Sequence, residues 1–147
     1  MKHNIVLLLL SFILMSFYCE GLKGLLESER PLRKETICMG DIVSIEESEI
    51  PCTTIDGDLL ILNTNLHTLG KYSEIETIHG SVIIERNSVL NNLNNLQAIN
   101  YVEQDFIAND NDVITEAEVR RIVNKILNDN EGYIGGNIIY NDMILSL

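Results

Sequence analysis

Basic residues are scarce in this 147-residue chain, and their scarcity limits the partners that it can bind. Ten lysines and arginines stand against 22 aspartates and glutamates, which gives a formal net charge of −12. Nucleic acids and anionic membrane surfaces attract basic surfaces, so we expect neither to be a partner. The acidic balance permits a basic partner, and it also serves simply to keep the chain in solution.

Motifs for catalysis and for cofactor binding are missing as well. The chain has no P-loop, no G-x-G-x-x-G sequence and no paired metal ligands. His67 and His79 lie near no serine or cysteine nucleophile motif, and the carboxylates are scattered. We therefore predict that the protein is not an enzyme and that it needs no cofactor.

Long hydrophobic runs are limited to one, at the N-terminus, where Lys2 and His3 precede the apolar residues 5–17. This run is shorter than the roughly 20 residues that span a bilayer. Small residues follow it and end at Gly21, so the pattern predicts a signal peptide over residues 1–21, with a retained anchor as the alternative. We expect a secreted protein with an N-terminal arm over 22–37 and no membrane insertion after cleavage.

Cysteine is rare, with three in the chain. Cys19 is removed with the predicted signal peptide, which leaves Cys38 and Cys52 as an even pair in an oxidising compartment. The sequence therefore predicts a Cys38–Cys52 disulfide. These two cysteines and the two remaining histidines do not form a metal-ligand set, so we expect no metal there.

A tandem repeat occupies the middle of the chain. The motif Ile55-x-Gly57-x-Leu59-x-Ile61 recurs 23 residues later over 78–84, as Ile-x-Gly-x-Val-x-Ile. A fixed period of this length is typical of a solenoid, whose repeats must stack to bury their apolar sides. Apolar residues alternate within each copy, which is strand periodicity. The motif predicts two coils of a right-handed parallel β-helix.

Further copies and one helix follow the tandem repeat. Residues 105–110 fit a third strand and corner, and residues 134–141 fit a fourth, partial copy. Between them, Thr115-x-x-Glu118 is a capping box that opens an apolar helical stripe, so we predict a helix over 116–128. We interpret the asparagines that follow the strands as structural corner residues; they are Asn63, Asn87 and Asn109.

The cysteine pair, the tandem motif behind it and the Leu/Asn-rich segment 90–99 resemble the receptor L-domain family, above all its small stand-alone members. The resemblance implies a mainly β fold with short helices: a leucine-rich-repeat-like solenoid of three to four coils over 38–145. It implies the same disulfide and a module that binds an extracellular protein or peptide ligand, or a receptor chain. Further cysteines that close the C-terminal end in the family are absent, which leaves the completeness of that end open.

The resemblance also indicates a binding face, because the outward side of the main sheet carries ligand contacts in the family. Alternation places Leu59, Ile61, Val82 and Ile84 in the core, and the residues between them outward. Three outward residues are apolar, which marks an interaction surface or a face that another segment covers. The predicted ligand-binding residues are Asp58, Leu60, Leu62, Ser81, Ile83 and Glu85.

Two alternative functions remain open. Residues 107–118 partly match an EF-hand calcium loop, with Asn109, Asn111 and Glu118 at ligand positions 3, 5 and 12. The first ligand position is Ile107 and the turn glycine is replaced by Asp112, so the loop is degenerate. The second alternative is a structural, leucine-rich-repeat-like adhesion protein, although the repeat period and the Ile-x-Gly corner differ from that class.

Overall fold

A computed structural model describes residues 34–43, 52–129 and 132–147. The predicted signal peptide and residues 22–33 of the predicted N-terminal arm lie outside the described residues. The last residue of that arm, Ile37, is the first residue of a strand.

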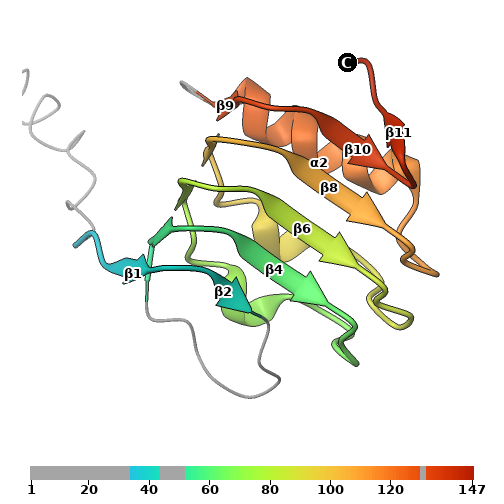
Figure 1. Cartoon of the computed structure of the whole chain (residues 1–147), viewed down its shortest axis with the longest axis horizontal. Helices are drawn as coiled ribbons and strands as arrows, with labels where there is room; N and C mark the ends of the chain where they lie inside the picture. Colours follow the sequence, from blue (N-terminus) through green and yellow to red (C-terminus); the bar gives the residue numbers. More distant parts are fainter. Residues whose placement is uncertain (1–33, 44–51, 130–131) are drawn as a thin grey trace, which may run out of the picture. The chain divides into compact units, whose positions relative to one another are not determined.

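The strands of the described residues form two mainly parallel sheets (Figure 1). The five-stranded sheet has the order β1 (Ile37–Met39), β3 (Thr54–Asp56), β5 (Thr77–Ile78), β7 (Tyr101–Val102) and β9 (Tyr133–Ile134). The six-stranded sheet has the order β2 (Ile42–Val43), β4 (Leu59–Leu62), β6 (Val82–Glu85), β8 (Phe106–Asn109), β10 (Ile138–Tyr140) and β11 (Met143–Ile144). Only the last pair, β10 and β11, is antiparallel among these strands.

The chain repeats one unit: a strand of the five-stranded sheet, a tight corner, a strand of the six-stranded sheet, and a return segment. In the register, Leu59 pairs with Val82 at the predicted offset of 23, and Val82 pairs with Phe106. The first return segment, 63–76, contains the 3-10 turn η1 (Gly70–Tyr72), and the second, 86–100, contains η2 (Asn94–Leu96). The third return segment contains the helix α2 (Glu116–Asn128), which lies behind β8 and β10 in Figure 1.

Glycine is required at the corners because neighbouring units stack there backbone against backbone. A Cβ atom on Gly57 would lie 2.6 Å from the carbonyl carbon of Gly40, and one on Gly80 would lie 2.6 Å from the carbonyl oxygen of Gly57. Such distances exclude any side chain, so only glycine allows the strands to keep this spacing.

The core lies between the two sheets and the return segments. The four predicted core residues of the tandem strands, Leu59, Ile61, Val82 and Ile84, are fully buried, as predicted. The return segments add fully buried leucines and isoleucines to the core, and Leu66 packs against it partly buried. These fully buried residues are Leu69, Ile75, Leu90, Leu93, Leu96 and Ile99.

A ladder of buried polar side chains runs along the other corner, where the six-stranded sheet ends. The Asn87 side-chain oxygen accepts hydrogen bonds from the Thr64 backbone nitrogen at 2.9 Å and from its hydroxyl at 2.8 Å. The Asn87 amide donates to the Ile61 carbonyl and to the Asn111 side-chain oxygen, both at 2.9 Å. Asn87 therefore satisfies buried polar groups of three successive units. Asn63, the residue before Thr64, has a left-handed backbone with φ 50°.

The predicted helix is confirmed with its bounds. Thr115 is the N-cap, and its hydroxyl accepts a hydrogen bond from the Glu118 backbone nitrogen at 3.3 Å. The buried residues of the helix form the apolar stripe that the sequence indicates; they are Val119, Ile122, Val123 and Ile126.

The Cys38–Cys52 disulfide is also confirmed. It joins β1 to the residues just before β3, and Cys38 pairs in register with Ile55. The strand–corner–strand unit of β1 and β2 was not expected from the sequence. Its Cys38-x-Gly40-x-Ile42 is a copy of the corner motif with cysteine in place of isoleucine, so the described residues contain five such units.

Candidate binding surface

The outward face of the six-stranded sheet carries the apolar side chains that the sequence singled out. Burial alternates along β4 and β6, where Leu60, Leu62, Ile83 and Glu85 are only partly buried and each follows a fully buried residue. Leu60 pairs directly with Ile83, and Leu62 with Glu85. In Figure 1 the return segments and α2 lie behind this sheet, and no described segment crosses its front.

The register extends this apolar surface across all six strands. Val43 pairs with Leu60, Ile83 with Ile107, and Ile107 with Ile139. Ile139 in turn pairs with Ile144 of β11, which is 70% exposed, whereas Val43 at the opposite edge is 52% exposed. We call this line of side chains the apolar row; it consists of Val43, Leu60, Ile83, Ile107, Ile139 and Ile144.

Polar side chains border the apolar row where the strands end. In the bordering row Glu85 pairs with Leu62, and its carboxylate lies 3.7 Å from the guanidinium of Arg86, whose side chain is 66% exposed. The Asn109 side chain exchanges two hydrogen bonds with Asp142, at 3.2 Å each. An apolar strip with a polar border has the composition of a protein–protein interface, with its dry centre and wet rim.

Of the predicted ligand-binding residues, Ser81 is not accessible on this face, and Asp58 makes a contact at the corner. Ser81, expected to point outward, is buried and 7% exposed, and its hydroxyl accepts a 3.4 Å hydrogen bond from the Asp105 backbone nitrogen. The Asp58 carboxylate accepts a 2.6 Å hydrogen bond from the Ser81 backbone nitrogen. The physical reason is the corner: residues directly after the corner glycine bond the neighbouring unit before the strand begins. Asp58 and Ser81 therefore hold the corner together.

The three residues of the degenerate calcium loop are engaged in three different parts of the structure. Asn109 bonds Asp142, as described above, and the buried Asn111 donates to the Ile84 carbonyl at 2.8 Å. One oxygen of Glu118 accepts a 2.8 Å hydrogen bond from the Leu93 backbone nitrogen. No group of three or more histidines, cysteines or acidic residues that could hold a metal ion occurs among the described residues.

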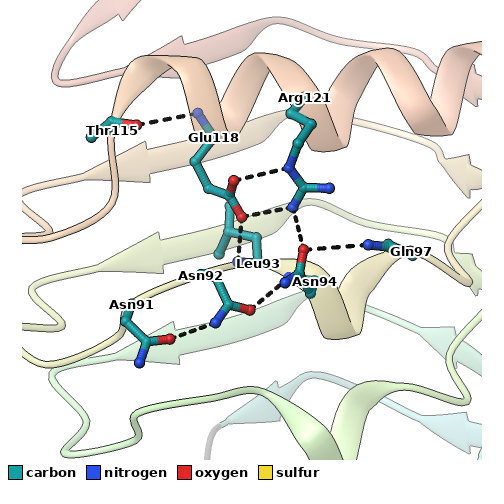
Figure 2. A network of polar contacts seen from close by, with 8 residues as sticks. All are labelled: Asn91, Asn92, Leu93, Asn94, Gln97, Thr115, Glu118 and Arg121. Carbon is teal, nitrogen blue, oxygen red and sulfur yellow. Dashed lines mark hydrogen bonds and ion pairs between the residues drawn. The ribbon is translucent and has the colours of Figure 1, made fainter.

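Glu118 belongs to a polar network that fixes α2 against the second return segment (Figure 2). Its carboxylate accepts hydrogen bonds from the Arg121 guanidinium at 2.9 and 2.7 Å, and Arg121 also donates to the Asn94 side chain at 2.6 Å. The hydrogen bonds from Arg121 lower the pKa of Glu118 most strongly, and burial opposes this effect. The hydrogen bonds to Glu118 in turn raise the pKa of Arg121. Glu118 is thus kept ionised as a structural acceptor.

Four residues of the apolar row were not predicted from the sequence: Val43, Ile107, Ile139 and Ile144. Two of them had a readable signal, because Ile107 and Ile139 occupy the second position of the third and fourth strand copies, as Leu60 and Ile83 do in the first two. Val43 lies in the cysteine-containing copy that was not recognised. Ile144 lies in β11, whose antiparallel pairing follows from no repeat.

No helix in the described ranges has the length and apolar character to cross a membrane. In comparisons with known proteins, the family model for the receptor L domain matches residues 51–141. No curated protein and no solved structure gives a significant match.

Proposed function

This chain belongs to the receptor L domain family, and we propose that it is a secreted, non-enzymatic module that binds an extracellular protein or peptide ligand, or a receptor chain. The family is one of extracellular ligand-binding domains. The disulfide between Cys38 and Cys52 supports an oxidising compartment, because disulfides persist there and are rare in the cytosol.

The proposed binding face is the outward side of the six-stranded sheet, and one observation carries it. The apolar row is continuous in register across β2, β4, β6, β8, β10 and β11. Isolated apolar side chains are common on protein surfaces, whereas a contiguous apolar strip tends to mark an interaction site. Leu60, Leu62, Ile83 and Glu85 remain candidate contacts, whereas Asp58 and Ser81 are candidates only as corner residues beside the strip.

In this proposal the strand–corner–strand units are also successive coils of a right-handed parallel β-helix. The repeated register at offsets of 23 and 24 residues and the backbone contacts between corner glycines support this proposal. Such a solenoid presents a flat, rigid sheet face, and a rigid face loses little conformational entropy when a partner binds.

The binding face is tested with a pair of charge-matched variants screened against extracellular proteins and peptides. Leu60→Arg with Ile83→Arg places two cations in the apolar row. Thr68→Arg with Ser88→Arg adds the same charge at exposed positions of the return segments. We expect a partner of the wild type to bind the second variant and to lose the first. Equal binding by both folded variants would refute the proposed face.

Secretion is tested separately, by the intact mass of protein expressed in eukaryotic culture. We expect a species in the medium that starts near Leu22, with Cys38 and Cys52 protected from alkylation until they are reduced. A chain that stays inside the cells with two free thiols would refute secretion while leaving the binding face to its own test.

A further inference from the structure

The five-stranded sheet has an outward face of its own. In its core row Ile55, Ile78 and Val102 are fully buried, so the residues on either side of that row point away from the core. The first outward row is Ile37, Thr54, Thr77, Tyr101 and Tyr133. The second follows the core row by one residue and is Met39, Asp56, His79, Glu103 and Gly135.

Aromatic rings gather at one end of this face. The rings of Tyr101 and Tyr133 stack with their centroids 5.2 Å apart and an interplanar angle of 25°. His79 lies 5.9 Å from Tyr101, and its Nδ1 is 3.1 Å from a Glu103 carboxylate oxygen. We call these four residues the aromatic patch. They come from three neighbouring units, so the fold and not the local sequence brings them together.

The aromatic patch is accessible. The side chains of His79 and Glu103 are 43% and 51% exposed, and Tyr133 is 46% exposed. Gly135 occupies the position beside Glu103 in the second row. A Cβ atom there would lie 2.9 Å from the Tyr133 hydroxyl and 2.1 Å from the Glu103 carbonyl oxygen. Gly135 therefore places no side chain between the Tyr133 ring and the backbone of Glu103.

The charge of this face is acidic. The ten positions of the two outward rows include Asp56 and Glu103 but no lysine or arginine. The carboxylate of Glu35 also lies over this face, where it accepts a 3.1 Å hydrogen bond from the Thr54 hydroxyl. With a net charge of −12 for the whole chain, the surrounding field attracts cations and repels anions.

We propose that the aromatic patch is a second binding surface, which takes an arginine side chain from a basic segment of a protein partner. A guanidinium stacks on an aromatic face and pairs with a carboxylate in the same plane, which an ammonium cannot do as well. Tyr133 supplies the exposed ring, and Glu103 supplies the carboxylate. The acidic character of this face favours a cation over a neutral sugar, which would also stack on tyrosine. This surface lies on a different sheet from the apolar row and does not depend on it.

The test uses the full secreted chain and a capped, fluorescein-labelled hexa-arginine peptide, with hexacitrulline as the neutral control of nearly the same shape. Fluorescence anisotropy at physiological salt measures the two dissociation constants. We expect the arginine peptide to bind and the citrulline peptide to bind much more weakly. Equal binding of the two peptides, or no binding of either, would overturn the proposal.

Single substitutions then locate the binding site. Tyr133→Leu should weaken hexa-arginine binding about two- to fivefold, as expected for a cation–π contact at an exposed site. Glu103→Gln should weaken it by about the same factor, as expected for an exposed ion pair. Asp112→Asn is the matched control, since it removes one exposed carboxylate from the third return segment. At physiological salt it should change binding by less than about twofold, because screening limits distant charges.

Two results would contradict this location. If Asp112→Asn weakens binding as much as Glu103→Gln, the attraction is a general property of the acidic chain. If the folded Tyr133→Leu and Glu103→Gln variants both bind as the wild type does, the aromatic patch is not the site. The two double-arginine variants of the previous section carry equal charge and should bind the peptide equally, so failure of one proposal can be told from failure of the other.

Discussion

The carboxylate of Glu118, in the first turn of α2, accepts a hydrogen bond from the backbone nitrogen of Leu93, 25 residues earlier, at 2.8 Å. A capping box would direct this side chain back to the N-cap of its own helix. Here Thr115 caps the helix as expected, while Glu118 fastens it to the second return segment. Glu118, which the sequence indicates as a helix-capping residue, thus joins α2 to the return segment of the preceding repeat.

We predict that Glu118→Ala lowers the free energy of unfolding by about 1–3 kcal/mol, since it leaves the Leu93 amide and Arg121 without their acceptor. Glu116→Ala is the control, because Glu116 makes a more exposed ion pair with Arg120, and it should cost at most about 0.5 kcal/mol. Urea unfolding of the two variants measures the difference. Equal stabilities would show that the contact between α2 and Leu93 contributes nothing specific.

The contribution of Glu118 should depend on pH with a definite sign. Its pKa in the folded protein is lowered from the ordinary value of 4.5, mainly by hydrogen bonds from Arg121. A lowered pKa contributes stability that is fully present above the unfolded value and is lost as the pH falls through the folded value. The stability gap between the wild type and Glu118→Gln should therefore narrow as the pH is lowered below 4.5. A gap that widens on acidification would contradict the assignment.

The asparagine ladder should be more important for stability than any exposed asparagine. Asn87 is fully buried and bonds Thr64, Ile61 and Asn111. Asn87→Ala should lower the free energy of unfolding by about 3 kcal/mol or more, because several buried polar groups lose their partner at once. Asn65→Ala, at an exposed position of the first return segment, should change it by less than about 0.5 kcal/mol. Thermal or urea unfolding provides the comparison.

The disulfide should stabilise the N-terminal strands β1 and β2. Cys38 and Cys52 are 14 residues apart, and closing a loop of that length is worth about 3 kcal/mol in the chain-entropy model. The double variant Cys38→Ser, Cys52→Ser and the reduced wild type should lose the same amount in urea unfolding. If reduction leaves stability unchanged, β1 and β2 are held by other contacts.

Calcium should leave the protein unchanged. The side chains of Asn109, Asn111 and Glu118 are already engaged with Asp142, Asn87 and Arg121. Calcium binding would have to break these hydrogen bonds before a site could form. We predict no shift in melting temperature and no heat at millimolar calcium; a saturable shift that Glu118→Gln abolishes would restore the calcium-binding alternative.

The sequence predicted the elements whose signals are local. The two tandem strands, the 116–128 helix and the cysteine pair each depend on alternation, a cap or a pairing rule, and the structure has all of them. It predicted the inward residues for the same reason. Leu59 and Val82 are buried because a strand with one face in the core must alternate.

The sequence could not predict what depends on the neighbouring repeat. Ser81 falls on the outward side by alternation, but the corner brings it against Asp58 and Asp105 of adjacent units and buries it. The unit of β1 and β2 was not predicted because Cys38 replaces the isoleucine of the motif. The offset from Cys38 to Ile55 is also 17 residues, which is shorter than the repeat period. The aromatic patch could be found only once the register had placed Tyr101 beside Tyr133.

An arginine scan along the apolar row, measured against a partner found by extracellular screening, tests the central claim most directly. Single variants at Val43, Leu60, Ile83, Ile107 and Ile139 would be compared by biolayer interferometry, with Thr68→Arg as the control of equal charge. The account predicts the largest losses of affinity at the central strands, above all at Ile83, and little change for Thr68→Arg. Wild-type affinity in every folded row variant would contradict the assignment of this face.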